Sequence, residues 1–270
     1  MSVATRGPGG ALAALGATDD AAALTAAAID GQRPRWVVRP CTLEDAARVV
    51  ALAHDEGLAV APRGGGHAQA LGGVPAAIDV VLDLAGLDAI IEYNPDDLTV
   101  TVQAGCTAGA LASVLADRRQ TLPIDPPGWA TRTLGGIAAT AASGPLRARY
   151  GTLRDLLLGV RFIQADGVMT WGGAKVVKSV TGYDVPKLMV GALGTLGVIG
   201  ELTLRLHPLP ESEATCLLVL RHAGEALDVV ARIVDSTIQP QRLELLDAGA
   251  MAACGLPAAA AGLVVSIGSA

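Results

Sequence analysis

Three glycine-rich segments constrain the possible folds of this chain more than any other feature of its sequence. The first, residues 62–67, has three consecutive glycines directly after an apolar run. The second spans residues 133–144 and the third residues 191–199. Because glycine has no Cβ, successive backbone N–H groups in such a segment can turn toward one anion. Three such segments predict three contact zones for an elongated ligand that carries a diphosphate.

A Rossmann site is the first alternative for the glycines at 64–66. Asp83 follows them by about twenty residues, the distance at which such a site carries its ribose-binding acid. However, Gln69 stands where G-x-G-x-x-G requires its last glycine, and residues 72–75 leave no room for the helix that must follow. The glycines therefore predict a binding loop of another kind. For this loop taken alone, a plain surface connection remains an alternative.

The composition favours a globular protein that does not bind nucleic acid. Of the 270 residues, 51% are hydrophobic, 17% are charged and 3% are aromatic, so Ala, Val, Leu and Ile must build the core. The net charge is −6 and no basic stripe stands out, which argues against a nucleic-acid partner. No apolar run reaches the ~18 residues of a membrane span, so membrane association is expected only through partners.

The cysteines predict no metal site. They are isolated, without a C-x-x-C or similar pair, at Cys41, Cys106, Cys216 and Cys254. Residues 1–10 do not resemble a signal peptide. Reduced cysteines in a cytoplasmic protein are the expectation that follows.

The order of predicted elements is typical of an α+β protein. An Ala-rich helix is expected over residues 10–30, and a strand at 36–39 precedes a helix capped by Thr42 and stopped by Gly57. The rest of the pattern predicts strands at 58–61, 78–84 and 98–103, a helix at 107–118 capped by Thr107, and a helix at 134–142. It also predicts a hairpin of 157–165 with 168–171, joined at Asp166-Gly167, and a long strand at 198–207.

Two prolines mark a predicted domain boundary after that long strand. Pro208 and Pro210 interrupt the pattern, and residues 211–270 then read as strand, helix, strand, short helix and strand. We therefore expect an N-terminal helical extension at 1–35, a main domain at 36–209 and a smaller α/β domain at 211–270.

Residues 36–209 resemble the FAD-binding domain shared by the relatives of vanillyl-alcohol oxidase and p-cresol methylhydroxylase (PCMH). The matching segments are 63–67, 134–140, 143–144, 150–155 and 196–199. Residues 122–127 and 178–191 resemble more specifically the FAD-binding subunit of bacterial glycolate oxidase, and residues 226–246 are similar to the start of that subunit's cap. The resemblance implies a PCMH-type FAD-binding fold of two α/β subdomains, followed by a truncated α/β cap.

The resemblance also implies which residues bind FAD. They are Pro62, Arg63, Gly64, Gly65, Gly66, His67, Ala68, Pro126, Thr133, Gly135, Gly136, Thr140, Ser143, Gly144, Gly197, Val198 and Ile199. In many oxidases of the wider family a histidine at the position of His67 carries the flavin covalently. The alternative is a loop histidine that hydrogen-bonds to its surroundings, and the rest of the chain resembles the non-covalent branch.

The function that the resemblance implies is that of the FAD-binding subunit of a glycolate (2-hydroxy-acid) oxidase, an FAD-dependent oxidoreductase acting on CH–OH groups. A second FAD subunit and an iron–sulfur subunit would be its partners. Arg147, Arg154 and Lys178 are candidate cations for the substrate carboxylate, although solvated surface charge is the favoured interpretation for any one of them taken alone. Two alternatives are a stand-alone oxidase with covalent flavin on His67 and a flavin-free scaffold subunit.

Overall fold

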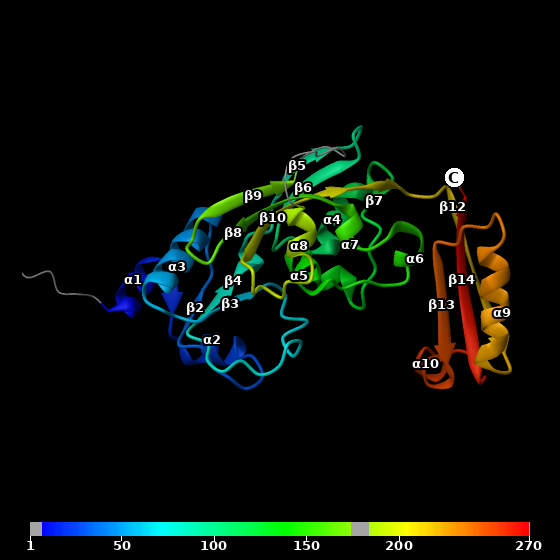
Figure 1. Ribbon diagram of the computed structural model, residues 1–270, viewed down its shortest axis with the longest axis horizontal. Helices are drawn as coiled ribbons and strands as arrows, with labels where there is room; N and C mark the ends of the chain where they lie inside the picture. The colour runs from blue at the N-terminus through cyan, green and yellow to red at the C-terminus, as the bar shows by residue number, and fades with distance from the viewer. Residues whose placement is uncertain (1–6, 174–183, 270) are drawn as a thin grey trace, which may run out of the picture.

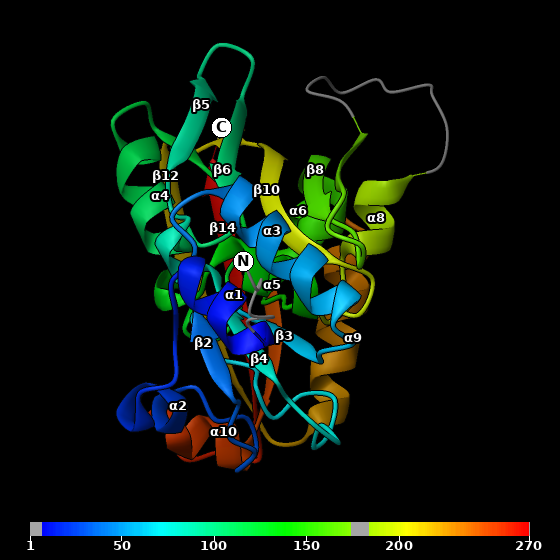
Figure 2. The same ribbon diagram turned by 90° about the vertical axis from the view of Figure 1, so that its left-hand side faces the viewer.

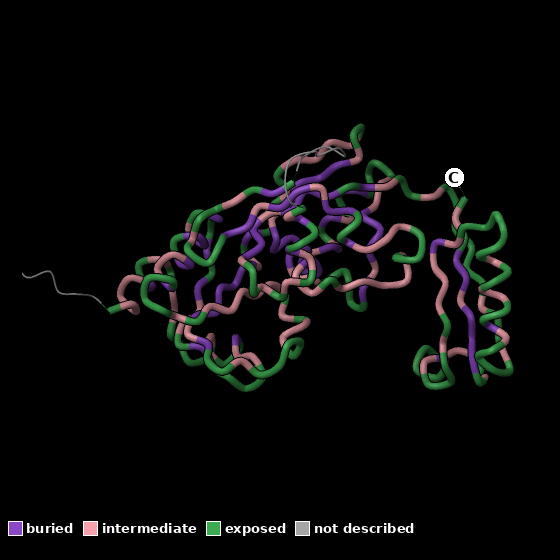
Figure 3. Tube along the Cα trace, in the orientation of Figure 1, coloured by how far each residue is buried: buried purple, intermediate pink, exposed green. Residues whose placement is uncertain are grey.

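A computed structural model describes residues 7–173 and 184–269 of the chain. Figure 1 shows an elongated body that contains two sheets, joined on one side to a smaller unit that holds the last strands of the chain. The buried residues concentrate along the strands of the body, whereas the C-terminal unit is mostly exposed outside its central strand (Figure 3).

The first sheet lies in the N-terminal part of the body and has the order β1-β2-β4-β3. Its strands are β1 (Ala17–Thr18), β2 (Trp36–Val38), β3 (Val60–Arg63) and β4 (Val80–Asp83), and β4 runs parallel to both β2 and β3. Val80 and Leu82 pack on one side of β4 and Val81 on the other. Both faces of the sheet are therefore covered, which is why this strand is apolar without alternation.

Helix α3 (Leu43–Asp55) covers one face of this sheet together with α1 (Pro8–Ala14) (Figures 1 and 2). The predicted N-cap of α3 is confirmed, because the backbone N–H of Asp45 donates to Thr42 Oγ1 at 3.1 Å. The opposite face is covered by the segment that follows α2 (Ala21–Ala26), through Ala27 and Ile29.

The single helix predicted over residues 10–30 is wrong. Two short helices, α1 and α2, flank β1, which pairs antiparallel with β2. Gly16 adopts a φ of +82°, which ends the first helix, and Asp20 accepts the N–H groups of Ala22 and Ala23 at 3.0 Å each, which starts the second. Alanine content favoured a helix, but the local caps and the pairing with β2 decide the structure.

The second sheet is antiparallel, with the order β5-β6-β10-β8-β9. Its strands are β5 (Ile90–Asn94), β6 (Thr99–Gln103), β8 (Leu157–Ile163), β9 (Met169–Gly173) and β10 (Val198–Arg205). The predicted turn between β8 and β9 is confirmed, with Gly167 at φ +83° and the N–H of Val168 donating to Asp166 Oδ1 at 3.0 Å.

Short helices pack beneath one face of this sheet (Figure 1). They are α4 (Ala108–Ala116), α5 (Leu134–Thr140), α7 (Leu153–Leu156) and α8 (Val185–Met189), while α6 (Arg147–Tyr150) lies toward the C-terminal unit. Thr107 caps α4 as predicted, accepting the N–H of Ala110 at 3.2 Å. The short strands β7 (Gln120–Thr121) and β11 (His207–Pro208) pair with each other at the end of the body nearest that unit.

The C-terminal unit is a three-stranded sheet with the order β12-β14-β13. Its elements are β12 (Ser212–Leu220), α9 (Ala223–Val234), β13 (Arg242–Asp247), α10 (Ala248–Ala253) and β14 (Ala261–Ser269), and α9 covers one face over Leu263 and Val265. Parallel and antiparallel sheets with helices packed on them confirm the α+β prediction. The division of the chain at residues 36, 209 and 211 stays a prediction.

Candidate functional site

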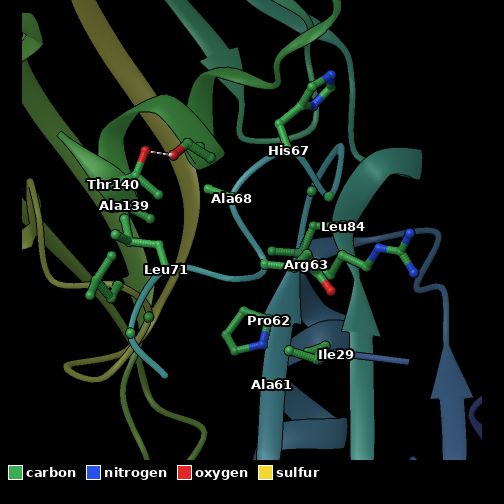
Figure 4. A pocket seen from close by; sticks show the side chains of 18 of the residues that line it. Ile29, Ala61, Pro62, Arg63, His67, Ala68, Leu71, Leu84, Ala139 and Thr140 are labelled. Atoms are coloured by element: carbon green, nitrogen blue, oxygen red, sulfur yellow. Dashed lines mark hydrogen bonds between the residues drawn. The ribbon is translucent and has the colours of Figure 1, made fainter. Parts of the chain in front are cut away.

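A loop of three glycines follows β3 and borders a cavity of about 480 Å³ (Figure 4). This volume lies within the range of about 300–1,000 Å³ that is usual for ligand and cofactor sites. Among the described residues, the backbone N–H groups of residues 64–68 donate no hydrogen bond to the protein. The loop therefore presents free donors beside the cavity, as a diphosphate requires.

The glycine loop lies directly against the start of α5. A Cβ on Gly64 would overlap the hydroxyl of Thr133, and that hydroxyl caps α5 by accepting the N–H of Gly136 at 3.3 Å. No side chain fits at position 64 while Thr133 keeps this role. The first and second glycine-rich segments, distant in sequence, thus form one wall.

Helix α5 presents small residues to the cavity, namely Gly136, Ala139 and Thr140. Thr140 turns its hydroxyl back to the carbonyl of Gly136, at 2.8 Å (Figure 4). Gly135 packs closely against Ala104, because a Cβ on Gly135 would lie 2.6 Å from the Cβ of Ala104. The helix leaves room for a flat group beside it.

The third glycine-rich segment closes another side of the cavity. The N–H of Gly191 donates to Ala138 O at 2.9 Å, and that of Leu193 donates to Ala139 O at 2.8 Å, so the segment is fastened to the end of α5. Gly194 follows at φ +76°, against the ring of Pro62. All three segments therefore meet at the same cavity.

Most of the cofactor residues predicted from the sequence line this cavity. Those that do are Pro62, Arg63, Gly64, Gly65, Gly66, His67, Ala68, Thr133, Gly135, Gly136, Thr140, Gly197 and Ile199. Their role in binding stays a prediction, but the structure brings them together from three separate parts of the chain.

Four predicted cofactor residues lie outside the cavity lining: Pro126, Ser143, Gly144 and Val198. Val198 is buried in the core beneath α3. Gly144 is packed so closely on the carbonyl of Asp125 that a Cβ would overlap it. Pro126 follows that aspartate in the chain and is buried, so Pro126 and Gly144 both lie at Asp125, beyond the cavity lining.

Two of the three candidate substrate cations are not brought to the cavity. Arg147 and Arg154 are exposed on α6 and α7, and neither lines it. Within the described part of the chain, the side chain of Arg147 makes a single long hydrogen bond, of 3.5 Å, to Ser143 Oγ. Lys178 lies outside the described residues.

Two predicted residues of the loop make specific bonds. His67 Nε2 lies 3.0 Å from Thr131 Oγ1, whose hydroxyl donates to Gly128 O at 3.2 Å, so the ring donates from Nε2. Arg63 donates to the carbonyl of Ala26 at 2.8 Å, and its guanidinium lies beside Gly66. The Arg63 side chain therefore fastens the loop to the end of α2.

The cavity lining contains no carboxylate. Asp83, the acid weighed for a Rossmann site, accepts Arg39 Nη2 at 2.6 Å and the N–H of Ala85 at 3.0 Å instead. Among the described residues, the cationic side chains of the lining are Arg63 and Arg132, in a chain whose net charge is −6. The cavity is thus locally positive, which favours an anionic ligand.

Sequence reasoning missed several lining residues. They are Ile29, Leu71, Val74, Ala104, Arg132, Leu193, Gly194 and Thr195, among others. Gly194 and Thr195 fall inside the third glycine-rich segment, and Arg132 directly precedes the second, so their positions next to the glycines were the available signal. Ile29 carried no such signal, because the fold brings it to the cavity from the N-terminal segment.

The two-sheet body and its glycine-walled cavity define a class: proteins that bind an elongated, diphosphate-bearing cofactor between α/β subdomains. Comparison with protein families matches residues 34–173 to the FAD binding domain. The chain therefore belongs to the FAD binding domain family, and FAD is its cofactor. The free N–H donors, the missing carboxylates and the bare glycine walls fit this anionic, flat-ringed group.

Curated relatives are similar over most of the chain. The glycolate oxidase subunit GlcD of Bacillus subtilis is 30% identical over 214 residues, 79% of this chain and 46% of that protein. The probable mitochondrial D-lactate dehydrogenase of Danio rerio is 34% identical over 225 residues, 82% and 45% respectively. A D-2-hydroxyglutarate dehydrogenase of Xanthomonas citri is 31% identical over 214 residues, 79% and 44%. The chain spans about half the length of these relatives.

Solved structures share the fold. Alkyldihydroxyacetonephosphate synthase matches with a TM-score of 0.79 at 20% identity, over 94% of this chain and 54% of that one. Substrate-bound p-cresol methylhydroxylase matches with a TM-score of 0.77 at 16% identity, over 98% and 62%. The prediction of a PCMH-type FAD-binding fold is confirmed.

The described part of the chain contains neither a membrane-spanning helix nor a group of metal-binding side chains. No helix there is both long and apolar enough to cross a membrane. Within residues 7–173 and 184–269, no three His, Cys, Asp or Glu side chains group as a metal site would require. The cytoplasmic location stays a prediction.

Proposed function

We propose that the chain is the FAD-binding part of an oxidoreductase that oxidises a 2-hydroxy acid and works as a subunit of a complex. The observation that carries the proposal is the cavity walled by three glycine-rich segments and free of carboxylates. The substrate class is supported by the names of the relatives, which oxidise glycolate, D-lactate or D-2-hydroxyglutarate.

Each wall of the cavity has a distinct part in holding the cofactor. The N–H groups of residues 64–68 would bind the diphosphate, and the small face of α5 at Gly136 and Ala139 would lie against a flat ring. FAD supplies the redox chemistry when bound, accepting the electrons of the CH–OH carbon. The chain itself binds and orients the cofactor and excludes water from its diphosphate.

A subunit role is supported by the cysteines and by one relative. GlcD is by its name a subunit of glycolate oxidase. The four cysteines of this chain are all free thiols and do not group with other metal-binding side chains in the described part of the chain. For the transfer of electrons away from the flavin, we propose a second FAD subunit and an iron–sulfur subunit as partners, with any membrane contact made by them.

This proposal leaves several candidates for the cationic side chain that binds the substrate carboxylate. Arg147, Arg154 and Lys178 stay the candidates for binding the substrate carboxylate. Because Arg147 and Arg154 are exposed outside the cavity lining, a partner subunit could bring its own cation to the flavin instead. Single Arg→Gln variants of the two, assayed in the complex, distinguish these cases: a raised KM for the acid assigns the residue to the substrate.

A second candidate function is a stand-alone oxidase with covalent flavin. It is favoured by the position of His67 in the cavity lining. The bond from His67 Nε2 to Thr131 supports the non-covalent alternative, since it gives the ring a structural partner.

The test is the visible spectrum of the purified protein, taken on pellet and supernatant after acid precipitation. Flavin released into the supernatant supports non-covalent FAD. Flavin kept in the pellet by the native chain, and lost from the pellet in His67→Ala, would establish the covalent oxidase. Colourless protein after incubation with excess FAD would overturn both and leave a flavin-free scaffold. Rapid turnover of glycolate or D-lactate by the isolated chain would contradict the subunit role.

A further inference from the structure

Arg132 is a half-buried cation in the cavity lining, and its side chain has no partner among residues 7–173 and 184–269. Its backbone is fixed on both sides: its N–H donates to Trp129 O at 3.1 Å, and its carbonyl accepts the N–H of Ala108 at 3.0 Å. Among the described residues, its guanidinium makes no hydrogen bond or ion pair with the protein. A rigid backbone thus holds an unpaired charge at the cavity.

The other arginine of the lining is already engaged. Arg63 donates to the carbonyl of Ala26 at 2.8 Å, on the side of the loop occupied by α2. Figure 4 shows the Arg63 guanidinium turned away from Leu71 and Ala139 on the opposite wall. Of these two cations, Arg132 is therefore the one that is free to bind a ligand.

The neighbours of Arg132 on both sides touch the glycine loop. Thr131 accepts His67 Nε2 at 3.0 Å, and a Cβ on Gly65 would lie 3.3 Å from the carbonyl of Thr131. Thr133 occupies the space that a Cβ of Gly64 would need. Arg132 thus sits between two residues that contact the diphosphate-binding loop.

A partly desolvated, unpaired guanidinium is unfavourable unless an anion joins it. The cavity lining supplies no carboxylate for this purpose. The ligand must therefore bring the anion, and the forked N–H groups of arginine match phosphate oxygens.

We propose that Arg132 is a cofactor-binding residue whose guanidinium binds the diphosphate of FAD, together with the backbone N–H groups of residues 64–68. This inference rests on the proposed binding of FAD in the cavity. It gives Arg132 a cofactor-binding role that the sequence did not predict, and it leaves Arg63 the role of fastening the loop to α2.

The test is equilibrium binding of FAD to the flavin-free chain, followed by flavin fluorescence, for the native protein and for Arg132→Met and Arg132→Lys. We expect Arg132→Met to weaken FAD binding about 10- to 100-fold, the effect of losing one charge-assisted hydrogen-bonding partner. Arg132→Lys should recover part of the loss. Arg232→Ala, an exposed arginine on α9 far along the chain, is the matched control and should bind FAD as the native chain does.

Two further readouts separate a charge contact from a merely structural role. FAD affinity of the native chain should fall with added salt, and the fall should be shallower in Arg132→Met, because screening acts on the charge that was removed. ADP, which has the diphosphate without the flavin, should displace FAD from the native chain and lose affinity in Arg132→Met by a similar factor.

The outcomes distinguish this inference from the proposed function. If the native chain binds no FAD, the proposed function fails and Arg132 has no such role. If the native chain binds FAD and folded Arg132→Met binds it equally well, the proposed function stands and the inference is overturned. A loss that is the same at every salt concentration would also overturn it.

Discussion

Arg242 in β13 forms an ion pair with Asp125 in the body, with 3.1 Å between Nε and Oδ2. Asp125 also accepts the N–H of Leu146 at 3.0 Å through its other oxygen. Arg242 reaches on to Glu213 of β12, with 2.5 Å between Nη1 and Oε1. One guanidinium therefore connects both edge strands of the C-terminal unit to the segment that carries Pro126.

Removing this guanidinium should destabilise the chain. We expect Arg242→Ala to lower the free energy of unfolding by about 1–3 kcal/mol, because the part-buried carboxylate of Asp125 and the more exposed one of Glu213 lose a charged partner. Denaturant unfolding followed by circular dichroism measures the effect. Arg221→Ala is the control, since Arg221 pairs with Glu225 while 89% exposed, and it should change stability far less. Equal effects of the two substitutions would refute a linking role for Arg242.

Gly64→Ala should impair cofactor binding through backbone displacement. The new methyl group would overlap the Thr133 hydroxyl, so the loop or the cap of α5 must move, at a cost of about 1–3 kcal/mol. FAD titration and thermal unfolding measure the two consequences. Gly249→Ala in α10 is the control, because its Cβ would lie at an ordinary 3.4 Å from Asp247 Oδ1. Native-like FAD binding by Gly64→Ala would show that the close approach is not required.

Stability should decrease in mildly acid solution because of His207. Burial, assisted by Arg205 and Arg149, lowers the pKa of His207 below its ordinary 6.5, so the unfolded chain binds a proton more readily than the folded one. This contribution is absent above about pH 6.5 and destabilises the fold as the pH falls from there toward the lowered pKa. His207 packs edge-on against Tyr150, with ring centroids 5.0 Å apart. Unfolding experiments between pH 5 and 8 should show a smaller pH dependence in His207→Gln; an unchanged slope would contradict the assignment.

The thiols should differ sharply in reactivity. Burial, with a smaller effect of Asp88, raises the pKa of Cys106 to about 11, and the side chain is 1% exposed. Its thiolate is therefore scarce at pH 8, whereas Cys41, Cys216 and Cys254 are exposed. Titration with a chromogenic disulfide should show three thiols reacting in the native chain and the fourth only after unfolding. Rapid reaction of all four would mean that the core around Cys106 opens readily.

Local signals predicted the elements with their own caps or turns. Thr42, Thr107 and the Asp166-Gly167 pair each act through bonds to residues two or three positions away, so the sequence carries them directly. Strands β1 and β5 were not predicted, because their structure depends on pairing with β2 and β6. Tertiary pairing of this kind leaves little trace in a single segment.

The residues of the candidate site likewise divide into those that local sequence predicts and those that only the tertiary fold brings together. The glycines were predictable because close approach and free N–H groups need residues without a Cβ. The bond of Arg63 to Ala26 spans 37 residues, and Ile29 reaches the cavity from the same distant segment, so neither followed from a local pattern. The unpaired state of Arg132 likewise depends on which residues the fold places around it.

The bond between Arg63 and Ala26 makes the segment that follows α2 a wall of the cavity. Ile29 lines the cavity directly, and exposed residues 19–22 connect this wall to β1. A protease that cuts there would release cofactor before it disrupts either sheet, and bound FAD would in turn slow the cut. Resistance to cleavage at residues 19–22 would therefore indicate that the protein has FAD bound. Proteases in the cell would then degrade the flavin-free protein faster than the protein with bound FAD.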